Sequence, residues 1–201
     1  MLKQSLVISL GILLALAGCT SDSPQPSGLV IINARVIDGS GSSAQMVNVR
    51  VVGDRIVSVG AFEASPDDTI LDADGLVLAP GFIDAHSHHE HQLGDMPEAL
   101  AAVSQGITTI VAGQDGGQQY PLAEFFASLE ASPVAINVAS YAGHNTLRGL
   151  IMGNDYQRHA TEGELAEISA LLQIEMDAGA LGLSTGLEYD PGSFSSIEEV
   201  V

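Results

Sequence analysis

The change of pattern at Pro80 constrains the fold more than any other feature of the sequence. After it, short apolar runs alternate with longer stretches of helical periodicity. The apolar runs, which we interpret as strands, cover residues 81–85, 107–112, 134–142 and 181–185. The helical stretches cover residues 97–104, 122–131 and 162–178, with a further helix expected to begin near Ser195. Repeated strand–helix units of this kind form a parallel sheet with helices packed against it.

The helix expected at residues 162–178 has the clearest end signals. Thr161 and Glu164 have the spacing of a capping box, in which each side chain satisfies a free backbone N–H of the first turn. Gly179 follows the last turn and suits the left-handed end of a helix. The sequence therefore fixes both ends of this helix without reference to tertiary structure.

Four strands are half of the eight that a closed (β/α)8 barrel requires. The sequence predicts an α/β fold. Residues 80–201 would form the N-terminal part of a TIM-type barrel, and that barrel would be incomplete. The first and last of these strands would then have unpaired edges, which favour aggregation. Residues 20–201 alone are therefore expected to be poorly soluble or oligomeric, and inactive.

Residues 28–79 contain only strand signals. Short runs rich in branched residues are separated by Gly and Asp, and Gly53-Asp54 forms a tight turn between two of them. This pattern predicts a small sheet or a small β-sandwich segment ahead of the barrel. We expect its role to be structural.

The first 27 residues are expected to direct the chain to a membrane. Lys3 precedes an apolar run that is too short to span a bilayer and is typical of a secretory signal. The run ends in Leu-Ala-Gly-Cys, which looks like a bacterial lipobox, so residues 1–19 are predicted to be a lipoprotein signal with Cys19 as the lipidated residue. Residues 20–27 are rich in Ser and Pro and would form a tether. An exported lipoprotein anchored in the cell envelope is predicted, facing the periplasm in a Gram-negative host.

The charge balance argues against a nucleic-acid partner. The chain has 6 Lys and Arg against 25 Asp and Glu, for a formal net charge of −19. Phosphate binding needs clustered Lys and Arg, which this sequence lacks.

The strongest chemical signal is the pair His86 and His88 at the end of the first barrel strand. Strand side chains alternate with a period of two, so both imidazoles project to one side, at the end where βα barrels carry their active sites. Two imidazoles so placed can bind one divalent metal ion. Asp84, two residues earlier, is a candidate to orient one of these ligands.

A β-segment that runs into Pro-Gly-Phe-Ile-Asp-Ala-His-Ser-His resembles the start of the amidohydrolase superfamily. Three later stretches, at residues 106–111, 143–148 and 179–192, resemble the N-acyl-D-amino-acid deacylases, or D-aminoacylases, within it. The resemblance implies a metal-dependent hydrolase of linear amides such as N-acyl-D-amino acids. It implies one or two divalent ions, typically Zn²⁺, bound in part by His86 and His88.

The resemblance also assigns roles to four further residues. Members of this family typically have Gly-Asn-Cys-Gly after the second barrel strand, with a metal-binding cysteine, and Asp115 stands in the place of that cysteine. Asp115 is therefore a candidate metal ligand, or else a turn residue in a Gly-rich loop. His144, Arg148 and Tyr189 are candidates for substrate binding, each with a structural role as the alternative, and a metal ligand is a further alternative for His144.

The only lysine of the chain is Lys3, so a carbamylated lysine cannot bridge two metals within residues 20–201. This favours an acidic or thiol bridge, for which Asp115 is the local candidate. The catalytic general base of the resembled family is an aspartate near the end of the barrel, which would lie beyond residue 201. Two alternatives are a cyclic amidase of the dihydroorotase or hydantoinase type and a non-catalytic, lipid-anchored binding protein.

Overall fold

A computed structural model describes residues 27–201, which divide into two units between Ala79 and Pro80. The predicted signal and the lipidation residue Cys19 lie outside the described residues. No helix within residues 27–201 is long and apolar enough to cross a membrane.

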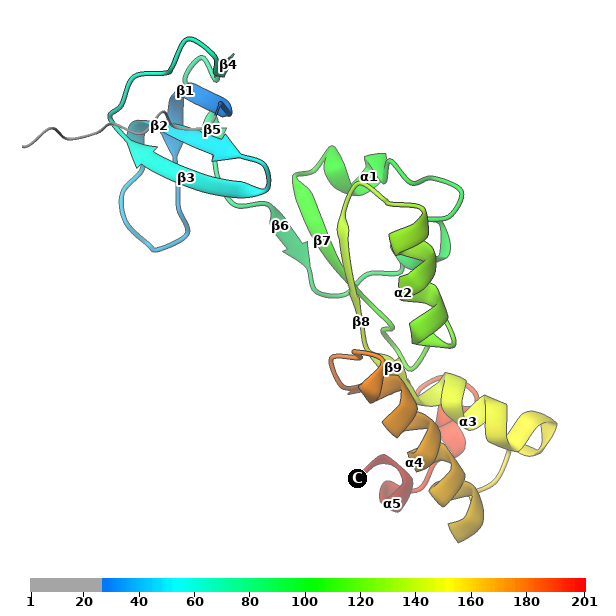
Figure 1. Cartoon of the computed structure of the whole chain (residues 1–201). Coiled ribbons are helices and arrows are strands. Elements are labelled where there is room, and N and C mark those ends of the chain that lie inside the picture. The colour runs from blue at the N-terminus through cyan, green and yellow to red at the C-terminus, as the bar shows by residue number, and fades with distance from the viewer. Residues whose placement is uncertain (1–26) are drawn as a thin grey trace, which may run out of the picture. The chain divides into compact units, whose positions relative to one another are not determined.

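The first unit is one five-stranded sheet. Its strands are β1 (Leu29–Val36), β2 (Gln45–Val52), β3 (Arg55–Gly60), β4 (Thr69–Asp72) and β5 (Val77–Leu78). The order is β3-β2-β1-β4, and β5 also pairs with β1 (Figure 1). Of the two arrangements expected from the sequence, these residues form the single sheet and not the sandwich. A bulge at Asn33, which has a φ of 56°, lets one edge of β1 pair first with β4 and then with β5, so all five strands share one sheet.

The second unit alternates short parallel strands with helices. The strands are β6 (Phe82–Asp84), β7 (Ile107–Ala112), β8 (Asn137–Ser140), β9 (Ala142–Gly143) and β10 (Leu183–Ser184). The α-helices are α1 (Leu100–Val103), α2 (Leu122–Ala131), α3 (His144–Met152), α4 (Glu162–Asp177) and α5 (Ile197–Val200). Single 3₁₀ turns are η1 (His89–His91), η2 (Gly153–Asp155) and η3 (Gly192–Phe194).

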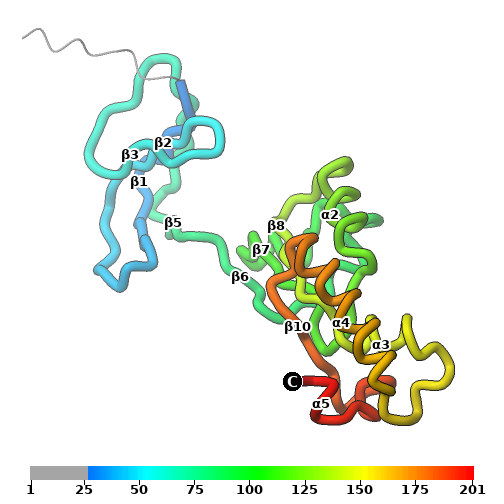
Figure 2. The backbone as a smooth tube through the Cα atoms, turned by 60° about the horizontal axis from the view of Figure 1, so that its bottom comes forward, coloured from blue at the N-terminus to red at the C-terminus, as the bar shows by residue number. Residues whose placement is uncertain are grey.

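The strands of this unit pair in sequence order. β6, β7 and β8 form a parallel sheet, and β9 pairs in parallel with β10. β8 continues into β9 through Tyr141, so the two sheets share one chain segment (Figure 2). An α/β unit with parallel strands is thus confirmed, whereas closure into a barrel stays a prediction.

Two apolar clusters hold the helices against these strands. Ile110 of β7 packs with Leu93, Ala102 and Ile136, and Leu122 of α2 packs with Ala142 and Ala180. Burial of each Leu or Ile side chain in these clusters stabilises the fold by about 1.5–3 kcal/mol. The carboxyl ends of β6, β7 and β9 are thereby fixed close to one another, which is where the candidate site lies.

One helix expected from the sequence is confirmed in detail, and one helix was not expected. The capping box of α4 is confirmed, because Thr161 Oγ1 accepts from the Glu164 N–H and the Glu164 carboxylate accepts from the Thr161 N–H. The helix α3 was not predicted. It begins directly after β9 without a side-chain cap, and Gly149 lies inside it, so its sequence carries few helix signals.

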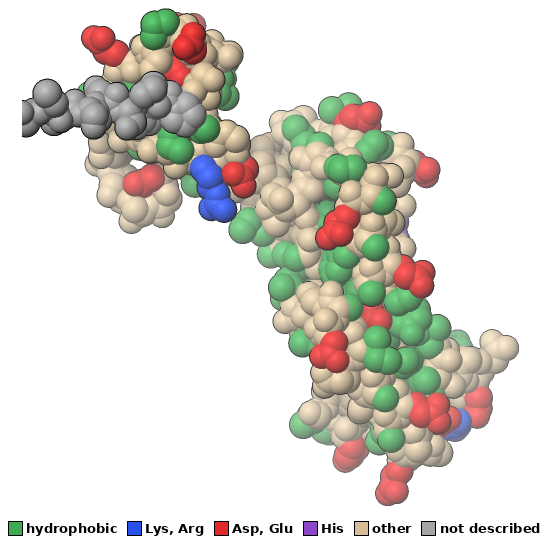
Figure 3. Space-filling view, in the orientation of Figure 1, with side chains coloured by type: hydrophobic (Ala, Val, Ile, Leu, Met, Phe, Trp, Pro, Cys, Tyr) green, Lys and Arg blue, Asp and Glu red, His purple; other side chains and the backbone are tan. Residues whose placement is uncertain are grey.

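Acidic side chains are spread over the face seen in Figure 3 and do not gather in one patch. Acidic residues distributed in this way are typical of a solvated protein surface.

Candidate metal centre

His86 and His88 follow the carboxyl end of β6 and are exposed, while Ser87 between them is buried. The Ser87 N–H donates to the Val111 carbonyl at the end of β7, a hydrogen bond of 3.1 Å. This bond holds Ser87 inward and so turns both imidazoles outward to the same side. The Asp84 carboxylate accepts from the His86 N–H at 3.2 Å, which ties the loop to its strand.

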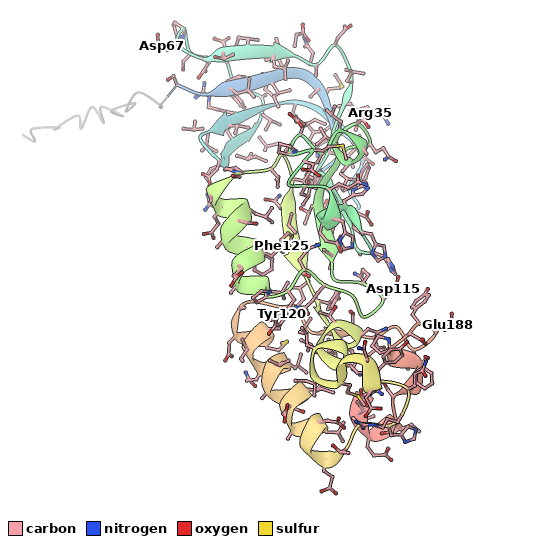
Figure 4. All side chains as sticks on the ribbon, turned by 90° about the vertical axis from the view of Figure 1, so that its right-hand side faces the viewer. Arg35, Asp67, Asp115, Tyr120, Phe125 and Glu188 are labelled. Carbon is pink, nitrogen blue, oxygen red and sulfur yellow. The ribbon has the colours of Figure 1, made fainter. Side chains whose placement is uncertain are left out.

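Asp115 lies on the loop that follows β7 (Figure 4). Its φ of 55° is left-handed, a conformation that Asp tolerates better than most residues. A Cβ on the preceding Gly113 would lie 2.3 Å from the Tyr141 carbonyl oxygen, so only glycine fits there. The Gly-rich sequence is therefore required for the loop to approach β9 and to present Asp115 outward.

Two side chains, Ser184 and Gln114, fix this loop. Ser184 of β10 accepts from the Gly116 N–H at 3.2 Å and donates to the Gly113 carbonyl at 2.5 Å. The Gln114 amide donates to the Ala85 carbonyl at 2.8 Å, which joins the loop to the segment that carries His86. Asp115 is thus held against the two histidines by contacts that do not involve its own carboxylate.

The three side chains converge on one oxygen atom. Nε2 of His86 and Nε2 of His88 each lie 3.2 Å from Asp115 Oδ2. Zn²⁺ with bonds of about 2.0–2.1 Å in tetrahedral geometry separates neighbouring ligand atoms by about 3.3 Å. Two imidazoles and one carboxylate are also a donor set that catalytic zinc sites use, with a fourth position open to solvent. The residues present therefore fit a divalent metal ion.

A second set of contacts fixes the segment that follows Asp115. The Gln118 side chain accepts from the Gly143 N–H at 2.5 Å and donates to Glu175 of α4 at 2.6 Å. The same Glu175 oxygen accepts from the Leu122 N–H at 2.9 Å. The buried Glu175 therefore connects α2, α4 and the loop of Asp115. Neither Gln118 nor Glu175 was expected from the sequence, because both sit in ordinary polar or helical contexts.

The structure does not bring Arg148 to this site as a substrate-binding residue. Arg148 is fully buried on α3, forms an ion pair with Glu199 of α5, and donates to the backbone carbonyls of Tyr156 and Arg158. A substrate carboxylate would have to displace the buried Glu199 side chain. These contacts favour the structural alternative for Arg148.

His144 belongs to the same buried group. Its Nε2 lies 2.8 Å from Glu199 Oε1, and its side chain is 2% exposed. Burial raises the pKa of the Glu199 carboxyl, but hydrogen bonds from Arg148 and His144 lower it by more, so that this pKa lies below its ordinary value. Glu199 comes 51 residues after Arg148, so no local pattern could have indicated the pair.

Tyr189 remains available to a ligand, because its side chain is more than half exposed. It lies three residues after Gly186, whose backbone packs so closely on Asp115 that a Cβ would lie 2.1 Å from the Asp115 carbonyl oxygen. Figure 4 shows its neighbour Glu188 on the same side of the unit as Asp115. Of the three expected substrate-binding residues, Tyr189 alone is exposed beside the candidate centre.

Comparison with known proteins gives a consistent result. No protein-family model matches the chain. An N-acyl-D-aspartate deacylase of Alcaligenes xylosoxydans xylosoxydans is 38% identical over 203 residues, which cover 90% of this chain and 41% of that protein. Over almost its whole length, the chain is similar to N-acyl-D-amino-acid deacylases.

Solved structures of deacylases have the same fold over this region. A D-aminoacylase with a binuclear metal center superimposes with a TM-score of 0.80 at 33% identity, covering 87% of this chain and 42% of that one. An N-acyl-D-glutamate deacylase from Bordetella bronchiseptica, complexed with zinc and a phosphonate inhibitor, gives 0.81 at 32% identity, with 88% and 42% covered. The chain spans about two-fifths of the length of these deacylases.

The Asp115 carboxylate is the contact point of both histidines, which leads to a prediction. Asp115→Ala is expected to weaken Zn²⁺ binding at least tenfold, because the only anionic ligand of the cluster is lost. Asp115→Cys is expected to keep Zn²⁺, since thiolate is a preferred zinc ligand. Isothermal titration of each metal-free variant checks both outcomes. Asp115→Asn, which also tolerates left-handed backbone, separates loss of charge from strain. Wild-type affinity in Asp115→Ala would show that this residue only forms the turn.

Proposed function

We propose that this chain forms part of a metal-dependent hydrolase that cleaves the amide bond of N-acyl-D-amino acids. The observation that carries the proposal is the convergence of His86 and His88 on Asp115 at zinc-ligand spacing. Similarity to deacylases over 90% of the chain supports the substrate class.

The described residues would contribute binding and orientation. A divalent ion held by His86, His88 and Asp115 supplies Lewis acidity, which lowers the pKa of water and polarises an amide carbonyl. Asp84 and Ser87 keep the two imidazoles on one side of the loop. The phenol of Tyr189 is exposed near this centre and is suited to donate a hydrogen bond to a substrate carboxylate.

The test is hydrolysis by the protein expressed from its complete coding region. We expect release of free amino acid from N-acetyl-D-aspartate, N-acetyl-D-glutamate or N-acetyl-D-leucine, loss of this activity after treatment with a chelator, and its recovery with Zn²⁺. The matching L-enantiomers are the control for stereochemistry. Turnover of dihydroorotate or a hydantoin in place of the linear amides would establish the cyclic-amidase alternative. Metal binding without turnover of any amide would indicate a binding protein.

Localisation is a separate proposal, supported by the Leu-Ala-Gly-Cys stretch alone. We propose that Cys19 becomes the lipidated N-terminus of an exported protein. Cys19→Ser is expected to abolish labelling by a palmitate analogue and to leave the protein unprocessed or released from the membrane fraction. Ser21→Ala, next to the expected cleavage site, is the matched control. Normal processing and membrane retention of Cys19→Ser would contradict the anchor.

A further inference from the structure

Glu90 is a buried carboxylate that the metal centre described above does not use. It lies in η1, directly after the residues that carry His86 and His88, and its side chain is 2% exposed. Its Oε2 has no hydrogen-bond partner among the described residues. A buried carboxylate oxygen without a donor is strongly unfavourable, so its position calls for a cation or a donor from solvent.

His91 offers a nitrogen to the same carboxylate group. Its Nε2 lies 3.7 Å from Glu90 Oε1, and its Nδ1 lies 2.8 Å from the side-chain amide of Gln119. The oxygen and nitrogen of such an amide exchange places by a half turn. With its oxygen toward His91, Gln119 accepts from the Nδ1–H and leaves Nε2 unprotonated. Metal-ligating histidines are commonly held in this way by a hydrogen bond to the other ring nitrogen.

His88 completes the group. Ligand atoms of His88, Glu90 and His91 all lie within 4.8 Å of one another. His88 therefore belongs to two clusters. The first contains His86 and Asp115, and the second contains Glu90 and His91. The second cluster has two imidazoles and a carboxylate, the same donor types as the first.

An open pocket gives access to this second cluster. Glu90, His91 and Gln119 line a cavity of about 700 Å³ together with Phe125 and Leu129. Figure 4 shows Phe125 projecting from α2 within this unit. An ion can thus reach Glu90 from solvent even though the carboxylate itself is buried, as a metal site requires.

We propose that Glu90 and His91, together with His88, bind a second divalent cation of the zinc class, with His88 bridging the two ions as an imidazolate after its second ring proton passes to solvent. The ion neutralises the buried Glu90 carboxylate and satisfies its free oxygen. Gln119 acts as a positioning residue, because it contacts the imidazole of His91 and sets which ring nitrogen is free. This site does not depend on the substrate of the enzyme.

Zn²⁺ stoichiometry of the protein expressed from its complete coding region tests the proposal. The metal-free protein is titrated with Zn²⁺, dialysed and analysed by elemental mass spectrometry. Glu90→Gln is expected to bind one ion fewer than wild type, and Asp115→Asn one ion fewer at the other cluster. The combined variant is expected to lose both ions. Glu98→Gln, an exposed carboxylate on the following segment, is the matched control and keeps the wild-type count.

Thermal unfolding gives a second readout. Because Glu90→Gln removes an unpaired buried charge, the metal-free variant is expected to unfold at the same or a higher temperature than metal-free wild type, and to gain less on addition of Zn²⁺. His91→Ala, at an exposed side chain, repeats the count if Glu90→Gln does not fold. A wild-type Zn²⁺ count in folded Glu90→Gln or His91→Ala would overturn the proposal. These results are independent of turnover, so they separate failure of this site from failure of the proposed amidase function.

Discussion

Replacing His86 and His88 together with alanine is expected to abolish metal binding and hydrolysis. The two imidazoles are two of the three ligands that converge within 3.2 Å at Asp115, and His88 also belongs to the group with Glu90 and His91. A catalytic metal contributes several kcal/mol to transition-state stabilisation, and each 1.4 kcal/mol is about tenfold in rate, so turnover should fall by at least about 10³. Elemental analysis and the deacylase assay measure the two effects on the same sample.

His159→Ala is the control for this experiment. His159 is exposed and belongs to neither ligand group. It should keep both metal and activity, whereas the single variant His86→Ala should lose the first ion only. Unchanged metal content in the double variant would place the metal elsewhere in the protein and remove the main support for the proposed function.

The second large effect concerns stability rather than chemistry. Glu199→Ala is expected to destabilise the protein by about 3–5 kcal/mol, because it leaves the buried guanidinium of Arg148 without its anion. Glu198→Ala, at the exposed neighbouring carboxylate, is the matched control, and its free energy of unfolding should change by less than about 0.5 kcal/mol. Urea unfolding at neutral pH measures both. Equal stability of the two variants would mean that Arg148 is compensated by the backbone carbonyls alone.

The same pair predicts the direction of a pH effect. The folded-state pKa of Glu199 lies below its ordinary value, so the carboxylate stabilises the fold above the unfolded-state pKa of about 4.3. That contribution is lost as the pH falls through the lower folded-state pKa. The stability difference between wild type and Glu199→Gln should therefore be constant near neutrality and shrink on acidification.

The correction at Arg148 changes how the proposed substrate site is understood. An arginine in a family-like stretch suggested a carboxylate clamp, but its two terminal nitrogens donate to Glu199 and to backbone carbonyls. Near Asp115, the exposed candidate for a substrate contact is Tyr189, which has a neutral hydroxyl. A charged partner for the substrate carboxylate is therefore not among the residues expected from the sequence.

Local patterns were sufficient for the features that depend on near neighbours. The period of two at His86 and His88, the Thr161–Glu164 capping box and the alternation of strands and helices after Pro80 are all present as patterns in the sequence. Each depends on backbone geometry over a few residues, which a linear pattern records. The choice between a sheet and a sandwich at residues 27–79 has no such pattern, because the bulge at Asn33 decides which strands β1 can pair with.

By itself, then, the sequence determined the pair of imidazoles, the alternation of strands and helices after Pro80 and the ends of α4. Only the tertiary structure decided that Asp115 meets both histidines at 3.2 Å, that Arg148 is committed to Glu199, and that Glu90 is buried with an unpaired oxygen. These contacts join loops and helices that are distant along the chain or reverse the expected exposure of a charge. They arise from packing of the whole unit. Contacts between residues that are far apart in the sequence produce no periodic pattern along the chain.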